Sequence, residues 1–218
     1  ADAEYTASPI MIEIPTRMTT GILSLSEESK RTVTALDIIA VVWFLGGIAF
    51  ISAHMLSYLH YRKRLMRQGM PIEDEEIAGL LSELKNELGI KGGISLWKYS
   101  RAASPMLMGF FKPVIVLPKE DYSRDELFFI LKHELVHYKR HDIWLKLLLV
   151  VAKGIHWFNP VVWMMQREAV IDMEMSCDER VIKNAGYDVK KAYTETLLST
   201  IHRQYAGQTL LSTQFKGG

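Results

Sequence analysis

Residues 123–142 read SRDELFFILKHELVHYKRHD, and this stretch decides the fold prediction. Ser123, followed three residues later by Glu126, has the form of a capping box, which predicts the start of a helix that runs nearly to the end of the stretch. The helix is apolar on the side that carries His133 and His137, so we expect both imidazoles to point into the fold. The sequence therefore predicts a helix at the centre of a globular domain.

The string HELVH at 133–137 has the spacing of a metal site. Positions i and i+4 of a helix share one face, so the rings of His133 and His137 can bind a single ion. Glu134 lies beside the pair, where its carboxylate can take a proton from an attacking water without binding metal. A chance match on an exposed helix is the alternative, but unliganded paired histidines are costly inside a fold. We therefore predict a catalytic Zn²⁺ site with Glu134 as the base.

A catalytic zinc site needs a third protein ligand. Residues 171–181, IDMEMSCDERV, offer Glu174 and Asp178, which are four apart and share one helical face. Glu174 would bind zinc, and Asp178 would accept the ring N–H of a ligand histidine. Glu168 and Asp172 have the same spacing. From spacing we favour Glu174 and Asp178, and Glu168 and Asp172 remain an alternative pair.

The most apolar run, IIAVVWFLGGIAFISAHMLSY at 38–58, carries no charged side chain. About 20 apolar residues cross the hydrocarbon layer of a membrane, so we predict a transmembrane helix over 36–61. A buried core helix is the alternative. Basic residues follow the run at positions 62, 63, 64 and 67. The positive-inside rule then places 62–218 in the cytoplasm, as the peptidase-like domain, and 1–35 outside as a loop.

The remaining patterns predict a small sheet beside further helices, so the expected fold class is α+β and mainly helical. Strands are expected at 94–99 and 106–117, the second as an edge strand interrupted at Gly109 and Pro113. The apolar stretch 143–165 is predicted to be a core or membrane-surface helix, broken at Asn159–Pro160, rather than a second span.

Composition excludes several classes of protein. The chain has 218 residues, 49% of them hydrophobic, and a net charge of +1. Its basic residues form no stripe with interleaved aromatics, so we expect no direct contact with nucleic acid. Cys177, the one cysteine, excludes an internal disulfide and is expected to be a small core residue. Because the N-terminus lacks both an initiator Met and a signal peptide, we expect a piece of a longer protein.

Four motifs in order resemble the BlaR/MecR-type membrane zinc metallopeptidases, the gluzincin-like antirepressor family of beta-lactam sensing. They are SPMLMGFFKPVIVLP at 104–118, HELVHYKRHD at 133–142, HWFNPVVWMMQRE at 156–168 and MEMSCDERV at 173–181. The resemblance implies that Glu174, not Glu168, is the third zinc ligand. It also implies a zinc domain on the cytoplasmic side of the cell membrane and a chain that stops before a further span.

The same resemblance implies a function. The chain would be a membrane-anchored zinc endopeptidase that cleaves a cytoplasmic protein in signal transduction, either a transcriptional repressor or itself. Membrane lipid and a second copy in a homodimer are the other partners considered. The alternative is a signal-transducing scaffold with a structural or weakly active zinc site. Glu134 favours the enzyme, because a structural site has no use for a base. A housekeeping membrane protease is a third hypothesis, and such a protease would lack the HWFNP and CDE surroundings.

Three other residues are weighed from the same resemblance. Gluzincins use a downstream His or Tyr to stabilise the oxyanion of the tetrahedral intermediate, so His202 and Tyr193 are candidates for that role. Asp142 matches an acidic position of the family. It would either hold the end of the motif helix or act as a solvated cap.

Overall fold

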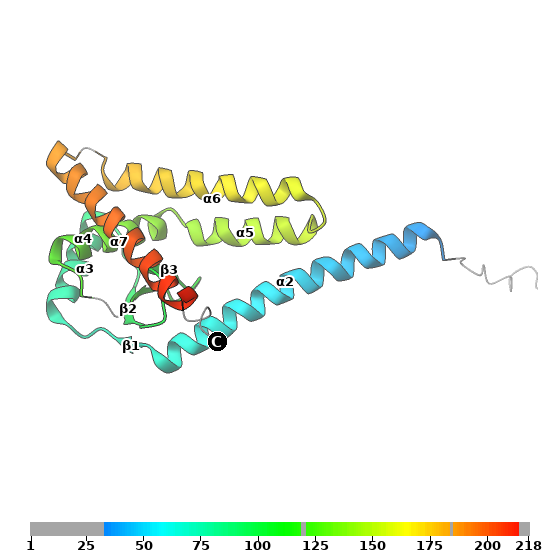
Figure 1. Ribbon diagram of the computed structural model, residues 1–218, viewed down its shortest axis with the longest axis horizontal. Coiled ribbons are helices and arrows are strands. Elements are labelled where there is room, and N and C mark those ends of the chain that lie inside the picture. The colour runs from blue at the N-terminus through cyan, green and yellow to red at the C-terminus, as the bar shows by residue number, and fades with distance from the viewer. Residues whose placement is uncertain (1–32, 119–120, 184, 214–218) are drawn as a thin grey trace, which may run out of the picture. The chain divides into compact units, whose positions relative to one another are not determined.

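The structure is a computed structural model that describes residues 33–118, 121–183 and 185–213 (Figure 1). Of residues 201–213 only the backbone is described. The chain divides into two units, 1–42 and 43–218, and the sheet and the helices that surround it belong to the second. Helices combined with one four-stranded sheet confirm the predicted α+β class.

Helix α2, Ala35–Gln68, is one uninterrupted helix over the whole of the predicted span. Among the described residues it is the one helix long and apolar enough to cross a membrane. Its apolar side chains are not enclosed: Phe44 is 59% exposed and Leu56 is 65% exposed, while Leu65 is the one residue of the helix that is buried. The alternative of a buried core helix is therefore wrong. The bounds of the extracytoplasmic loop and of the cytoplasmic domain stay predictions.

The sheet has the strand order β1-β2-β4-β3. Strands β1 (Met70–Pro71) and β2 (Ser95–Lys98) pair antiparallel, β2 and β4 (Val114–Leu117) pair parallel, and β3 (Met106–Met108) pairs antiparallel with β4. The single strand predicted at 106–117 is thus two strands. Gly109, whose φ of 101° suits a residue without a Cβ, begins the turn between them, and Pro113 ends it. Strand β3 consequently forms one edge of the sheet.

Helix α4, Arg124–Lys139, is central to the globular unit and begins at the predicted capping box. The Ser123 hydroxyl accepts from the backbone N–H of Glu126, and the Glu126 carboxylate accepts from the backbone N–H of Ser123. The buried face of α4 carries Leu131 and Leu135, both fully buried against the leucines of α3 (Glu75–Glu87) and against β4. This packing fixes the helix that carries HELVH.

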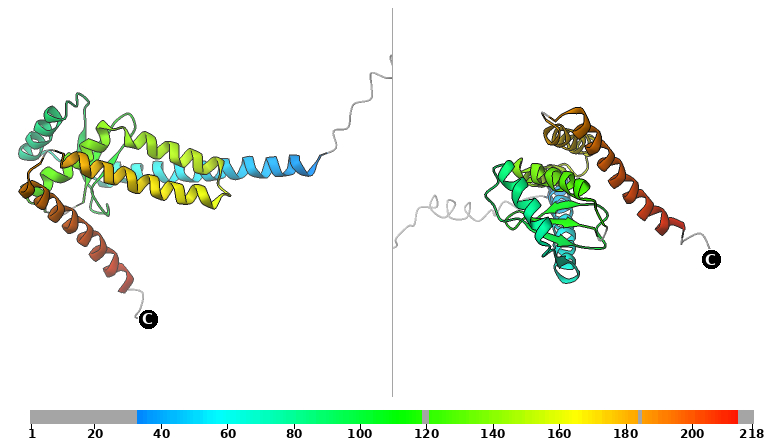
Figure 2. Two further views of the ribbon diagram at one scale, coloured as in Figure 1. Left: turned by 90° about the horizontal axis from the view of Figure 1, so that it is seen from above. Right: turned by 90° about the vertical axis from the view of Figure 1, so that its left-hand side faces the viewer.

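Three further helices surround α4. Helix α5 (Asp142–Ile155) and helix α6 (Pro160–Val181) form an antiparallel hairpin, and α7 (Tyr187–Thr213) follows (Figures 1 and 2). The predicted break at Asn159–Pro160 is confirmed, since Asn159 caps α6 by accepting from the backbone N–H of Val161. Helix α4 contacts α3, α5, α6, α7 and β3, and all of these except α3 contribute side chains to the pocket on the HELVH face.

Candidate metal centre and active site

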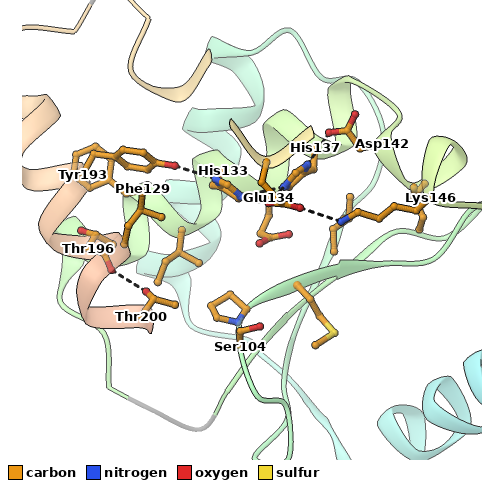
Figure 3. Close-up of a pocket in the computed structure, with 17 residues that line it drawn as sticks. Ser104, Phe129, His133, Glu134, His137, Asp142, Lys146, Tyr193, Thr196 and Thr200 are labelled. Atoms are coloured by element: carbon orange, nitrogen blue, oxygen red, sulfur yellow. Dashed lines mark hydrogen bonds and ion pairs between the residues drawn. The ribbon is translucent and has the colours of Figure 1, made fainter. Parts of the chain in front are cut away.

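The two histidines of HELVH project from α4 into a shared pocket (Figure 3). His137 is buried and His133 is partly buried. Their Nε2 atoms lie 3.0 Å apart. The i, i+4 spacing therefore brings two nitrogen donors to one point.

Glu174 of α6 adds an oxygen at the same point. Its Oε2 lies 3.2 Å from Nε2 of His137 and 3.5 Å from Nε2 of His133. Zinc at about 2.0–2.1 Å from tetrahedral ligands requires ligand atoms about 3.3 Å apart. The three donors fit a zinc ion at this spacing, with a fourth position left for water. The competing residues Glu168 and Asp172 are exposed, and the structure gives them no contact with either imidazole.

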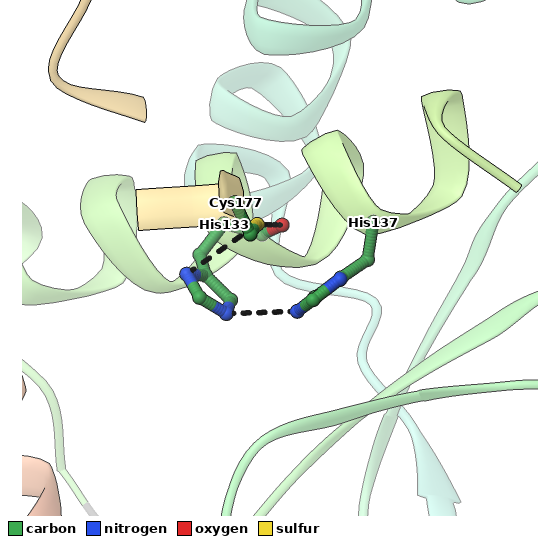
Figure 4. Close-up of side chains that lie close together, drawn as sticks. All are labelled: His133, His137 and Cys177. Carbon is green, nitrogen blue, oxygen red and sulfur yellow. Dashed lines mark hydrogen bonds between the residues drawn. The ribbon is translucent and has the colours of Figure 1, made fainter. Parts of the chain in front are cut away.

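Cys177 offers a second way to complete a metal site. Ligand atoms of His133, His137 and Cys177 all lie within 4.8 Å of one another (Figure 4). The sulfur, however, lies 3.8 Å from Nδ1 of His133 and 3.6 Å from that residue's backbone oxygen, so it is beside the ring rather than at the meeting point of the Nε2 atoms. The donor set with Glu174 is tighter, and we favour it. Cys177 is fully buried, as expected for a core residue.

Each histidine is held from behind through its Nδ1. Nδ1 of His137 donates to Oδ2 of Asp142 at 2.7 Å, and Nδ1 of His133 lies 3.2 Å from Oδ1 of Asp178. Because a carboxylate only accepts, these contacts put a ring proton on each Nδ1, so Nε2 is the nitrogen that each ring can offer to a metal ion once its own proton is lost. Such carboxylate partners fix the orientation of metal-binding histidines.

The sequence prediction for Asp178 matches this contact, whereas the contact of Asp142 with His137 differs from both roles expected for Asp142. Asp142 is the first residue of α5 and is buried, with its other oxygen 3.3 Å from Nε of Arg140. It is therefore not a solvated cap. Through Arg140 it holds the end of the motif helix, which is one of its two expected roles, and its contact with His137 comes in addition. The signal that could have found it is its distance of five residues from His137, just beyond the end of α4.

Tyr193 of α7 lies behind His133. Its hydroxyl donates to Oδ1 of Asp178 at 2.6 Å, and its oxygen lies 3.0 Å from Nδ1 of His133. In this arrangement it supports the histidine from the side opposite Nε2. Its role at an oxyanion stays a prediction, as does that of His202, whose side chain lies outside the described residues.

Glu134 lines the pocket next to the two imidazoles (Figure 3). It is buried, and burial raises the pKa of its carboxyl; the neighbouring His133 and His137 oppose that rise without cancelling it. A raised pKa suits a group that accepts and then returns a proton. The prediction that Glu134 faces the reacting position is consistent with this placement.

Charge in the pocket is arranged around Glu174. Hydrogen bonds from His133 and His137 hold the pKa of its carboxyl far below the usual value, so the oxygen facing the imidazoles stays ionised. Burial lowers the pKa of His137, but hydrogen bonds with Cys177, Glu174 and Asp142 outweigh it and raise the pKa to about 10. Nζ of Lys146, from α5, lies 3.4 Å from the second oxygen of Glu174. Among the described residues that line the pocket, Lys146 is the only lysine or arginine.

The pocket has a volume of about 340 Å³, and residues of edge strand β3 are among those that line it. Residues 104–107, which lead into edge strand β3, form one wall, and Thr196 and Thr200 of α7 form another. An extended chain can lie beside such an edge strand. The arrangement thus combines two imidazoles, a carboxylate, a buried base and an open strand edge in one place.

This combination defines a class, the metallopeptidases that carry a H-E-x-x-H helix and a glutamate on a later helix. The family model described as BlaR1 peptidase M56 matches residues 3–216. The chain therefore belongs to the M56 peptidases, a family of membrane metallopeptidases, and the predicted BlaR/MecR-type resemblance is confirmed.

Three curated relatives show the range of similarity. "Regulatory protein BlaR1" of Bacillus licheniformis is 30% identical over 196 residues, which cover 88% of this chain and 32% of the relative. "Methicillin resistance mecR1 protein" of Staphylococcus aureus (strain Mu50 / ATCC 700699) is 35% identical over 111 residues, 50% of this chain and 19% of the relative. "Regulatory protein BlaR1" of Staphylococcus aureus is 25% identical over 187 residues, which cover 84% of this chain and 32% of the relative. The chain spans about a third or less of these relatives.

Proposed function

We propose that this chain is the catalytic part of a membrane-anchored zinc endopeptidase that acts in signal transduction. In this proposal residues 36–61 of α2 cross the membrane, 1–35 lie outside and 62–218 face the cytoplasm. The substrate is a cytoplasmic protein, either a transcriptional repressor or the peptidase itself. The relatives named as regulatory and resistance proteins support the signalling role.

The proposed metal ligands are Nε2 of His133, Nε2 of His137 and Oε2 of Glu174. Their mutual distances of 3.0, 3.2 and 3.5 Å carry the proposal. Asp142 and Asp178 would hold the two rings through Nδ1. A bound zinc ion would supply Lewis-acid chemistry, lowering the pKa of the attacking water and polarising the peptide carbonyl.

Glu134 is proposed to handle the protons. Its carboxylate would take a proton from the attacking water and return it to the nitrogen of the departing amine as the peptide bond breaks. Burial of the carboxyl supports this role, because a raised pKa makes the carboxylate a stronger base toward the proton of the attacking water.

Edge strand β3 is proposed to bind the substrate. A peptide segment in extended form would pair with the free edge of β3 and so pass over the pocket, with its scissile carbonyl above the three donors. Met106 and Leu107 of β3 line this pocket, which supports the placement. Substrate recognition would then depend on an unfolded or loop segment, since a folded helix cannot pair with a strand edge.

Glu134→Gln in the full-length protein tests the peptidase against a scaffold. The variant keeps the size of the side chain but cannot accept the proton, so zinc content should stay unchanged while cleavage falls by at least about 100-fold. Cleavage is read as new protein N-termini, identified by mass spectrometry in cells expressing the parent or the variant. This readout includes self-cleavage and works even where the substrate has not been identified.

His137→Ala is the matched control, since it should remove both zinc and cleavage. If the parent and Glu134→Gln give the same new termini at the same rate, Glu134 is not the base and the proposed mechanism is wrong. If the parent binds zinc and produces no termini that His137→Ala lacks, the scaffold explanation holds instead.

A further inference from the structure

The α5–α6 hairpin exposes an unusually apolar surface. From Leu147 to Gln166 the sequence LLLVVAKGIHWFNPVVWMMQ holds a single charged residue, Lys153. Large apolar side chains of this segment are exposed rather than packed into a core. They are Leu148 at 61%, Ile155 at 43%, Phe158 at 60%, Val161 at 56%, Trp163 at 41%, Met164 at 65% and Met165 at 64%. Exposure of such an apolar surface to water is unfavourable in free energy, so another apolar partner is expected to bury it.

The tip of the hairpin is attached to the apolar part of α2 by indole hydrogen bonds. Nε1 of Trp43, on α2, donates to the backbone oxygen of Ile155 at 2.8 Å. Nε1 of Trp157 donates back to the backbone oxygen of Trp43 at 3.2 Å. Trp163 in turn donates to the backbone oxygen of Trp157 at 3.1 Å. The tip and this part of α2 therefore share one environment.

Glycines allow the two backbones to approach closely. A Cβ added at Gly46 would meet the ring of Trp157, and one added at Gly47 would lie 3.0 Å from the backbone oxygen of Gly154. A Cβ at Gly154 would meet the side chain of Ile51. Small residues at the crossing point are the usual means by which helices pack inside a membrane, where lipid supplies no hydrophobic force between them.

Lys153, the one charge in the segment, is covered by aromatic rings. Its Nζ lies 3.7 Å from the ring centre of Trp163 and 5.7 Å from that of Phe50 on α2. The face of an aromatic ring attracts a cation and partly replaces its water. The charge therefore does not prevent the hairpin from entering an apolar medium.

We propose that the α5–α6 hairpin is inserted in the lipid bilayer beside α2, entering and leaving on the same side. This inference rests on the proposed span of α2. The rise from Lys146 to Ile155 is about 14 Å, roughly half of a hydrocarbon layer of about 30 Å. The hairpin is thus too short to cross and long enough to reach the bilayer centre. In this proposal, lipid acyl chains contact the exposed apolar side chains of the hairpin.

The ends of α5 and α6 that lie away from the tip of the hairpin carry residues of the proposed metal site. Asp142 and Lys146 lie at the start of α5, and Glu174 and Asp178 lie near the end of α6. An inserted hairpin therefore holds the site at the membrane surface, where it can reach only substrate segments that come close to the bilayer.

Fluorescent labelling of single cysteines tests the insertion. The full chain is placed in vesicles of phosphatidylcholine and phosphatidylglycerol, and Phe158→Cys and Met164→Cys are labelled with an NBD group. Phe44→Cys on α2 and Glu83→Cys on α3 are the references for lipid and for water. The unaltered chain gives the labelling background, because its Cys177 is fully buried. Lipids brominated on their acyl chains quench a label in the bilayer, and dithionite reduces a label in water.

We expect the labels at 158 and 164 to be quenched by brominated lipid as strongly as the label at 44, while the label at 83 is reduced by dithionite. Quenching at 44 with labels at 158 and 164 open to dithionite would overturn the insertion and leave the α2 span intact. Labels at 158 and 164 protected from both agents would overturn it too and assign the surface to a second copy of the chain. Absence of lipid quenching at 44 would overturn the span and the insertion together.

Discussion

Oδ2 of Asp142 on α5 lies 2.7 Å from Nδ1 of His137 on α4, and both side chains are buried. The contact exists because the chain reverses at His141, which adopts a left-handed backbone with a φ of 59° between the two helices. One carboxylate thereby fixes the ring of a proposed metal ligand and, through Arg140, the end of α4.

Asp142→Asn tests this contact. The amide has the same shape but lacks the charge, so it holds the protonated Nδ1 less firmly and makes Nε2 a poorer donor. Loss of such a partner lowers metal affinity by about 10–100-fold. The affinity is measured by titrating the metal-free protein with zinc against a chelating indicator. Asp121→Asn, at an exposed residue before α4, should leave it unchanged. Equal affinities in the two variants would show that Asp142 does not orient His137.

The identity of the third ligand is tested by comparing Glu174→Gln with Cys177→Ala. We expect Glu174→Gln to lose most bound zinc, because a neutral amide replaces the oxygen anion at the meeting point of the Nε2 atoms. Cys177→Ala should still bind one zinc per chain, since the sulfur lies beside Nδ1 of His133. Metal per chain is measured by elemental analysis of protein purified with zinc.

Replacing zinc by cobalt shows directly whether Cys177 is a metal ligand. A thiolate ligand produces an intense charge-transfer band in the near-ultraviolet spectrum of the Co²⁺ protein, and oxygen and nitrogen ligands do not. If the parent shows such a band and Cys177→Ala does not, the third ligand is Cys177 and not Glu174.

Gly109→Ala tests the turn that separates β3 from β4. At a φ of 101° a side chain is strained, and the new Cβ would meet the backbone oxygen of Lys112. Strain of this kind costs on the order of 1–3 kcal/mol, so the melting temperature in detergent should fall. Gly79→Ala is the matched control, because Gly79 lies inside α3 with open space around it. That change should stabilise the protein by about 0.5–1 kcal/mol. A melting temperature that Gly109→Ala leaves unchanged would contradict the strain at this turn.

The sequence predicted the features that depend on neighbours along the chain. The capping box at Ser123 sets the start of α4, and Asn159–Pro160 separates α5 from α6. Both signals act through backbone groups within a few residues. The pair Glu174 and Asp178 was chosen on helical spacing and on resemblance, and it lies at the histidines as expected.

Features that depend on chain reversals were not predictable in the same way. The pairing of Asp142 with His137 needs the left-handed residue His141, and a histidine gives no sign of that conformation. The stretch 106–117 has the composition of one strand, and only the turn at Gly109 divides it. Lys146 reaches Glu174 from another helix, 28 positions away in sequence, a contact that no local pattern encodes.

Tyr193→Phe separates the predicted oxyanion role from support of the metal ligand. The hydroxyl now donates to Asp178 and lies beside Nδ1 of His133, so its removal leaves Asp178 with one donor fewer and His133 less firmly held. If support is its role, zinc affinity should fall, and cleavage measured at saturating zinc should recover toward the parental rate. If instead Tyr193 turns to the oxyanion, affinity should stay parental while cleavage falls by about 100-fold or more, as for other oxyanion donors. We expect the first result. Thr194→Val, at an exposed neighbour whose hydroxyl bonds back to its own helix, is the control and should change neither quantity.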